Sequence, residues 1–226
     1  MELPTAFSVK KARYAQKRIS ERIIKRDVLP ERIEKIAGVD VAYRGGVGVG
    51  SAVVVKMPEF KVVDSATIVV YARFPYIPTL LAFREVYPAY AALKKLKTSF
   101  DVLMIDGNGL LHPYRAGFAC HLGLVVDKPS IGIAKKLLCG YVGEWRGRWA
   151  PVLDNGETIG AAVKTSQRAK PIYVSIGHKI SLRTAIRIVL WSTRKGVKLP
   201  EPIRQAHICA TQRVKTLKSS NTLSTI

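Results

Sequence analysis

The sequence has few acidic residues, few cysteines and no long apolar run, and each shortage excludes a class of protein. Its three cysteines, Cys120, Cys139 and Cys209, are far apart and never in CxxC spacing, so we expect neither a disulfide framework nor a zinc site. No apolar run reaches the roughly 18 residues of a membrane-spanning helix, and no signal peptide opens the chain. We therefore expect a soluble, cytoplasmic protein with no membrane association.

The shortage of acids is matched by an excess of bases, because 37 lysines and arginines face only 16 aspartates and glutamates. The resulting formal charge of +21 is far more than solubility requires and is typical of a protein with a polyanionic partner. Nucleic acid is the first expectation; an anionic membrane surface is the competing one, and the lack of an apolar span and of a signal peptide argues against it. A chain of 226 residues fits one α/β domain, and we expect a monomer.

Three of the few carboxylates lie in apolar segments. Asp40 lies within residues 36–43, Glu85 lies in an apolar stretch, and Asp106 ends the run 102–106. A buried carboxylate is unfavourable unless another group compensates its charge. A divalent cation is one such group, so these three side chains predict a metal site and hence a chemical reaction.

The first part of the chain changes from helical to extended patterns. Residues 9–35 mix basic and apolar residues, which predicts one or two amphipathic helices, the first ending near Pro30. Residues 38–71 alternate β-branched runs with turn residues, which predicts a meander of three antiparallel strands. Asp40 falls on the first of them.

The middle of the chain predicts a helix followed by a βαβ unit. Helical spacing places Leu81 and Glu85 on one face, and Pro88 should kink or restart that helix. Residues 102–134 follow the order strand, loop, apolar helix and strand, which is typical of parallel pairing. Asp106 therefore lies at the carboxyl end of a buried strand, where open α/β sheets bind their ligands.

The last third predicts further strands at 148–153, 158–164 and 172–176, then a helix with Ser181 as its N-cap. From Arg213 the chain is basic and rich in Ser and Thr, so we expect a flexible tail over 213–226. The order of elements is that of the ribonuclease-H-like α/β fold, with a central mixed sheet flanked by helices. It predicts Asp40 and Asp106 on neighbouring strands, with Glu85 reaching them from a helix.

Four motifs in this order resemble the endonuclease V family, the deoxyinosine-directed repair nucleases: GVDVAY at 38–43, PYIPTLLAFRE at 75–85, DGNGLLHP at 106–113 and SIGIAK at 130–135. The resemblance continues to LPEPIRQAH at 199–207, so it covers nearly the whole chain before the tail. It implies a single catalytic domain over 1–212 and cleavage of the second phosphodiester bond 3′ to deoxyinosine. It also implies Mg²⁺ as the cofactor, with Mn²⁺ as a substitute.

The resemblance assigns catalytic roles by motif position. Asp40, Glu85 and Asp106 match the catalytic acids and would bind the metal, which would activate water and stabilise the phosphate during the reaction. His207 falls where the family has a fourth acid or a histidine, acting as a ligand or as an acid/base. Lys135 would add a positive charge near the phosphate.

The resemblance also assigns the residues that contact the damaged base. Tyr76, fixed between two prolines, would wedge into the duplex beside an extruded base. The implied substrate-binding set also includes Pro78, Gly107, Asn108, Gly109, Leu111, His112, Gly117 and His121. The chain departs from the usual family residues at Thr79 (glycine), Ala82 (serine), Asn108 (histidine), Tyr114 (arginine) and Cys120 (serine).

Each of these residues alone also fits an ordinary structural role. Glu85 could be a solvated helix residue, the Asp106 segment a simple turn, and Tyr76 a packed loop residue. Two other functions also fit: a different nuclease of the ribonuclease-H fold, and a non-enzymatic nucleic-acid-binding protein. Inosine-containing RNA is open as an alternative substrate to DNA, because local contacts decide whether a 2′-hydroxyl is recognised.

Overall fold

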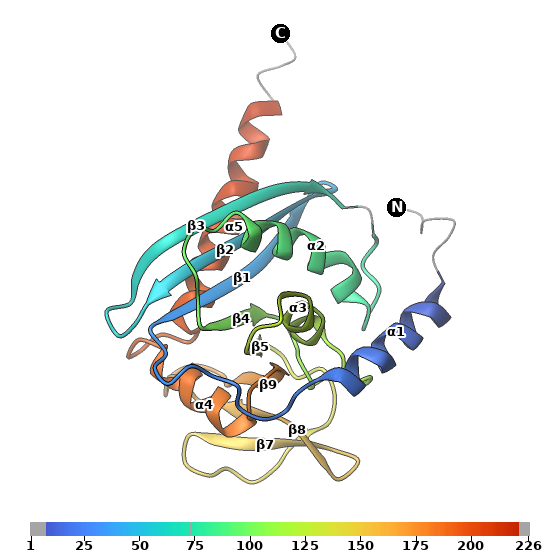
Figure 1. The fold of residues 1–226 in the computed structure, drawn as a ribbon, viewed down its shortest axis with the longest axis vertical. Coiled ribbons are helices and arrows are strands. Elements are labelled where there is room, and N and C mark those ends of the chain that lie inside the picture. Colours follow the sequence, from blue (N-terminus) through green and yellow to red (C-terminus); the bar gives the residue numbers. More distant parts are fainter. Residues whose placement is uncertain (1–7, 73, 222–226) are drawn as a thin grey trace.

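The computed structural model describes residues 8–72 and 74–221, and nine strands form one continuous sheet (Figure 1). The strand order is β3-β2-β1-β4-β5-β9-β8-β7-β6. β1 (Lys35–Arg44), β2 (Val47–Lys56) and β3 (Lys61–Tyr71) pair antiparallel, as the alternation of β-branched residues predicts. The expected meander is therefore confirmed.

The parallel part of the sheet joins β1 to the βαβ unit. β4 (Val102–Asp106) pairs parallel with β1 and with β5 (Ser130–Ala134), and α3 (Phe118–Val126) connects β4 to β5. The sheet then continues antiparallel through β9 (Ile172–His178), β8 (Glu157–Val163), β7 (Trp149–Asp154) and β6 (Tyr141–Val142). It is thus the mixed sheet that the sequence predicts.

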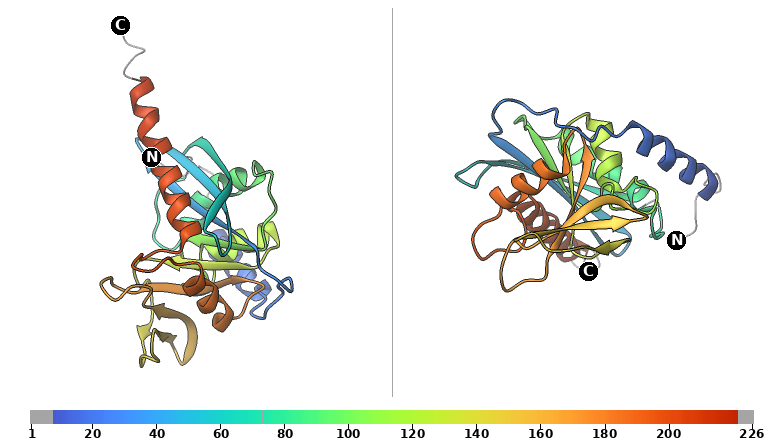
Figure 2. Two further views of the ribbon diagram at one scale, coloured as in Figure 1. Left: turned by 90° about the vertical axis from the view of Figure 1, so that its left-hand side faces the viewer. Right: turned by 90° about the horizontal axis from the view of Figure 1, so that it is seen from below.

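Helices cover both faces of this sheet (Figures 1 and 2). α2 (Leu81–Lys94) and α3 bury their apolar residues in one core, against β1, β2 and β4. α4 (Leu182–Trp191) and α5 (Glu201–Asn221) contribute to a second core on the other face. The central strands β1, β2, β4 and β5 are therefore buried on both faces, which explains their runs of Val, Ile and Ala.

Two glycines allow these helices to approach the sheet closely. A Cβ atom at Gly38 of β1 would collide with the backbone of Pro202 in α5, and one at Gly50 of β2 would collide with Pro88 in α2. No other residue leaves this space free. Gly38 thus sets the position of α5 over β1, which matters for the site described below.

Three sequence expectations need correction. The basic N-terminal helix, α1 (Val9–Arg22), ends eight residues before Pro30, and residues 23–34 contain no second helix. α2 continues through Pro88 as one helix and does not restart there. The described part of the expected tail, residues 213–221, belongs to α5, which extends beyond the sheet in Figure 1.

These differences have physical reasons. The carbonyl and Cβ of Pro88 lie where a Cβ atom at Gly50 of β2 would collide with them, so the helix packs tightly on the strand at this proline. The first turns of α5 pack on the core through Ile203 and Ala206, and no glycine or proline interrupts residues 203–221, so the helix continues past the sheet. Residues 222–226 of the predicted tail lie outside the described residues. Within the described chain, no helix is long and apolar enough to cross a membrane.

Candidate active site

The predicted pair of aspartates lies at one edge of the sheet. Because Val39 of β1 pairs with Ile105 of β4 in a parallel register, the next residue on each strand, Asp40 and Asp106, ends up at neighbouring positions. Asp40 is only 8% exposed, although it carries a carboxylate. The sequence expectation that these two acids adjoin on central strands is confirmed.

His207 joins the two aspartates from α5. Its Nδ1 lies 2.7 Å from Oδ2 of Asp40, while Oδ1 of Asp40 accepts a hydrogen bond from the backbone N–H of Val41 at 2.8 Å. One ligand atom each from Asp40, Asp106 and His207 lie within 4.8 Å of one another. Gly38 lets the first turn of α5 lie directly against β1, and the imidazole further along the same helix therefore reaches the aspartates.

Glu85 faces the same space from α2 but lies outside that group of three. It is 8% exposed, and burial together with the negative charges of Asp40 and Asp106 raises its pKa to about 8. The guanidinium of its neighbour Arg84 lies 3.9 Å from the centre of the Tyr43 ring, and the Tyr43 hydroxyl donates to the Arg84 carbonyl at 3.0 Å. These contacts fix α2 against β1.

Lys135 supplies a positive charge beside Asp106. It follows β5 directly, and its Nζ lies 2.6 Å from Oδ2 of Asp106. Burial and the charge of Asp40 raise the pKa of Asp106, while Lys135 opposes that rise. The cluster of acids at this edge therefore has one cation in direct contact.

The donor set fits a divalent cation. Two carboxylates and one imidazole converge from three different elements, and carboxylate oxygens are the preferred ligands of Mg²⁺ and Mn²⁺. Burial and the mutual repulsion of the acids raise the pKa of both Glu85 and Asp106. A cation bound among them would remove this repulsion.

A small pocket lies on the α2/α3 side of this edge. Its volume is about 130 Å³, and its lining includes Tyr76, Asn108, His112 and Gly117 of the predicted substrate-binding set. Leu138 also lines it, a residue that no sequence signal indicated. The structure thus brings four predicted residues, distant in the sequence, around one cavity.

The other predicted substrate-binding residues lie elsewhere. Gly107 and Gly109 pack beneath the pocket, where a Cβ atom would meet Phe118 and the backbone of Ile176. The side chain of Leu111 is fully buried in a small core with Val152 and Ile159. Pro78 and His121 do not line the pocket; the His121 ring packs edge-on against Phe83, with 5.3 Å between the ring centres, in a neighbouring groove.

Thr79 also lines the pocket, and its backbone carbonyl anchors the loop to which it belongs. This role was not predicted from the sequence. The carbonyl accepts hydrogen bonds from Nε2 of the fully buried Gln16 at 2.6 Å, from Nη1 of Arg13 at 3.4 Å and from His112 at 3.1 Å. Thr79 has a φ of +67°, a conformation that favours glycine. The family usually has glycine at this position, and that was the one feature of the sequence that could have indicated such a backbone.

The hydrogen bonds of His112 fix its protonation. Its Nδ1 accepts from the backbone N–H of Tyr114 at 3.2 Å, so Nε2 carries the proton that is donated to Thr79. Burial, together with the charges of Arg13 and Arg115, lowers the pKa of His112 to about 4. The pocket wall is therefore neutral here at physiological pH.

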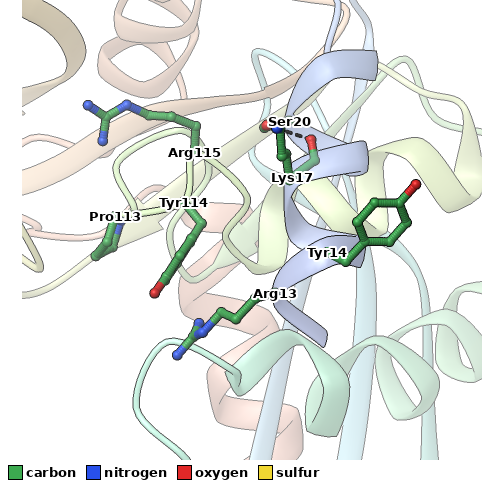
Figure 3. A pocket seen from close by; sticks show the side chains of 7 residues that line it. All are labelled: Arg13, Tyr14, Lys17, Ser20, Pro113, Tyr114 and Arg115. Atoms are coloured by element: carbon green, nitrogen blue, oxygen red, sulfur yellow. Dashed lines mark hydrogen bonds between the residues drawn. The ribbon is translucent and has the colours of Figure 1, made fainter. Parts of the chain in front are cut away.

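α1 forms an outer wall next to this loop. Figure 3 shows Arg13 beside Tyr114, and the guanidinium lies 4.2 Å from the ring centre. An open pocket of about 460 Å³ separates α1 from residues 113–115. The basic helix predicted from the sequence therefore reaches the site through Arg13 and Gln16.

The fold and site together define a nuclease of the ribonuclease-H-like class, with a central mixed sheet carrying acids on adjacent strands. The sequence model of the Endonuclease V family matches residues 17–208, and the chain belongs to that family. An endonuclease V of Thermofilum pendens is 58% identical over 92% of this chain and 90% of its own length. An endonuclease V of a Roseiflexus species is 42% identical over 92% of this chain and 94% of its own length.

Solved structures agree with this assignment. The endonuclease V of Streptomyces avermitilis superimposes with a TM-score of 0.84 at 34% identity, covering 96% of this chain and 98% of that one. Endonuclease V of Ciona intestinalis, in complex with a 23-mer DNA containing an inosine followed by a ribo-adenosine, gives a TM-score of 0.85 at 29% identity, with 95% and 100% covered. The resemblance of the motifs to this family is confirmed.

Proposed function

We propose that this nuclease cleaves DNA at the second phosphodiester bond 3′ to deoxyinosine in a reaction that requires Mg²⁺, with Mn²⁺ as a substitute. The observation that carries the proposal is the convergence of Asp40, Asp106 and His207 within 4.8 Å at the sheet edge. The Ciona relative in complex with inosine-containing DNA supports the choice of substrate. We assign catalysis to one domain over residues 1–212, acting as a monomer in the cytoplasm.

Asp40, Asp106 and His207 would hold the cation, and Glu85 would face it from α2. A bound divalent cation supplies positive charge that lowers the pKa of water and stabilises charge developing on a phosphate. Burial and the charges of Asp40 and Asp106 raise the pKa of Glu85 to about 8, so a cation bound among the acids would favour its ionised carboxylate. Asp40 keeps the His207 ring oriented through the 2.7 Å contact.

Lys135 would shift its role when substrate binds. Its Nζ now neutralises Asp106 at 2.6 Å, and the side chain is 41% exposed, so it is free to turn toward a phosphate oxygen. A lysine acts there as a compact point charge. It would stabilise the negative charge of the phosphate without forming a covalent bond.

The 130 Å³ pocket would receive the extruded base. Oδ1 of Asn108 is buried with no hydrogen-bond partner among the described residues, and Asn108 lines this pocket. Hypoxanthine carries a proton on N1 that adenine lacks, and a carboxamide oxygen can accept it while the NH₂ group donates to O6. An unpaired acceptor in a pocket favours the ligand that satisfies it.

Tyr76 would occupy the gap that the base leaves. It is 66% exposed at the pocket mouth, so its ring is available to stack on the neighbouring bases. Extrusion costs a few kcal/mol and is easiest for a poorly paired base, which favours inosine before any pocket contact forms. Gly117, Gly107 and Gly109 would let the backbone approach.

The test compares matched duplexes with and without one deoxyinosine, in Mg²⁺ and in Mn²⁺. A single nick that depends on both inosine and metal supports the proposal. Nicking that ignores inosine supports a different nuclease specificity of the same fold. An inosine-containing RNA strand, cut in parallel, decides whether RNA is also a substrate.

A further inference from the structure

We infer that a basic groove between α4 and the β7–β8 region is a second binding site, for the phosphate backbone of the nucleic acid. The groove has a volume of about 760 Å³, and its lining includes five cations and no acid: Arg148, Lys164, Arg168, Arg194 and Lys195. The site is distinct from the acids of the active site. The inference rests on the proposed function only in taking a nucleic acid as the ligand.

One end of the groove, at Lys164, lies on the same edge of the sheet as the active site, while its other end, at Arg194, reaches Phe60 in the turn after β2. Ala134, at the end of β5, pairs with Tyr173 near the start of β9, and Ile172 pairs with Val163 at the end of β8. The residues that follow β5 and β8, Lys135 and Lys164, are therefore separated by the width of one strand, β9. Both follow strand ends on the edge that carries Asp106.

The separation between Asp106 and the Lys164 end of the groove suits a polynucleotide strand. β4, which carries Asp106, lies three strand spacings from β8, or roughly 14 Å at about 4.8 Å each. Charges on one strand of duplex DNA repeat about every 3.4 Å along the axis, so about four nucleotides cover this separation. One strand can thus reach both sites.

Two of the arginines build the groove. Arg148 donates from Nε to the Lys164 carbonyl at 3.2 Å and from Nη2 to the Thr165 carbonyl at 3.1 Å. Arg194 donates to the Phe60 carbonyl at 3.1 Å and lies 3.5 Å from Glu201. These contacts hold the walls at residues 164–165 and 194 in place.

The remaining three cations are free to bind. Lys164, Arg168 and Lys195 are exposed and form no ion pair with any residue that the structure describes. Lys164 lies 4.2 Å from the ring centre of Trp145, which is 40% exposed. Unpaired cations in a concave surface concentrate a positive potential, and an exposed indole offers a face on which a base can stack.

The groove also lies on the opposite side of the sheet from the base pocket. Leu190 and Thr193, at the end of α4, line it, and α4 shares its core with α5, the helix that carries His207. The base pocket is on the α2/α3 side. A strand that places a base in the pocket and its backbone in the groove would cross the edge of the sheet that carries Asp106.

The experiment compares two triple variants of the full chain. The groove variant is Lys164→Ala, Arg168→Ala and Lys195→Ala; the control is Lys94→Ala, Lys95→Ala and Lys97→Ala. The control removes equal charge from exposed residues around the end of α2, on the other face of the sheet from α4. Binding of an inosine-free 20-nucleotide single strand and an inosine-free duplex is measured in EDTA across a salt series.

Affinity falls as the salt concentration rises. In the groove variant, we expect the slope of log affinity against log salt to become less negative, by about 2 for the single strand and nearly 3 for the duplex. Its affinity at 100 mM salt should fall about 10- to 100-fold, and the control should change far less. Because no inosine, cation or cleavage is involved, the result does not depend on the proposed cleavage reaction.

Equal losses in the two variants would show that only total charge matters, and unchanged binding in the groove variant would overturn the site. A third variant, Lys164→Arg, Arg168→Lys and Lys195→Arg, retains the charges and should bind as the unmodified protein does. Thermal unfolding of all three variants confirms that they are folded. Loss of binding in the charge-retaining variant would also contradict a phosphate-backbone site.

Discussion

Nδ1 of His207 lies 2.7 Å from Oδ2 of Asp40, although the two residues are 167 positions apart in the chain. The contact joins α5 to β1 at the sheet edge, where Gly38 allows the helix to approach. It places His207, which motif position indicated as a ligand or an acid/base, beside two of the three predicted acids. The consequence is a site whose geometry depends on the position of α5.

The first prediction concerns this imidazole. His207→Ala should raise the Mg²⁺ concentration needed for half-maximal cleavage about 10- to 100-fold, because Asp40 loses its neighbour and the cation loses a donor. The measurement is a metal titration of the cleavage rate. His207→Ala should unfold at nearly the temperature of the unmodified protein, since the side chain is half exposed. An unchanged metal titration would remove His207 from the site.

The second prediction concerns the pocket loop. Thr79 has a φ of +67°, and a Cβ atom in that region costs about 1–2 kcal/mol. Thr79→Gly should therefore be more stable than Thr79→Ala by about 1 kcal/mol, although both lose the hydroxyl. For a chain of this size the difference corresponds to about 2–4 °C in the unfolding temperature. Equal melting temperatures would show that the backbone at residue 79 is not strained.

The third prediction concerns the start of α5. Glu201 is buried and accepts hydrogen bonds from Arg204 at 2.7 and 2.8 Å and from Gln205 at 2.7 Å. The hydrogen bonds from Arg204 outweigh burial and lower the pKa of Glu201 below its usual 4.5. Glu201→Gln should reduce the free energy of unfolding by about 1.5–3 kcal/mol at pH 7.

The pH dependence separates this effect from a packing defect. Because the folded pKa is depressed, the stabilisation by ionised Glu201 is fully present above pH 4.5 and is lost as the pH falls through the folded value. The two proteins should therefore converge in stability on the acid side. A difference that stays constant from about pH 7 to about pH 3 would contradict the electrostatic explanation.

The fourth prediction concerns Tyr76. Tyr76→Ala removes the exposed ring and should slow cleavage of an inosine-containing duplex about 5- to 100-fold, which corresponds to the loss of stacking with one base. Cleavage of an inosine-containing single strand should slow less. Tyr76→Phe should retain activity because stacking needs only the ring. Tyr141→Ala, which removes a similarly exposed aromatic ring on the outermost strand, serves as the control. Similar losses on duplex and single strand would argue against a wedge.

The sequence predicts best the features that local patterns determine. The meander, the βαβ unit and the adjacency of Asp40 and Asp106 were predicted because strand periodicity and parallel pairing determine them. The hydrogen bond from Gln16 to Thr79 was not, because it joins segments 63 residues apart and neither residue has a distinctive pattern. α5 was not predicted as a helix, and its part beyond residue 212 was expected to belong to a flexible tail because that stretch is basic and rich in Ser and Thr.

Among the site residues, too, some positions follow from local sequence patterns and others do not. Lys135 beside Asp106 is explained by its place directly after β5, one strand away. The arrangement of Glu85 outside the group of three, with His207 inside it, depends on how two helices lie on opposite faces of the sheet. Side-chain packing fixes those positions, and no spacing in the sequence encodes them.

The most direct test of the central claim is a cleavage map of a duplex that contains one deoxyinosine, made with Mg²⁺ present and after its removal by EDTA. The proposed function predicts one nick, at the second phosphodiester bond 3′ to the inosine, and the acids at the sheet edge predict that it vanishes with EDTA and in Asp106→Asn while binding of the duplex persists. Cutting at the same position by Asp106→Asn, or in EDTA, would contradict it.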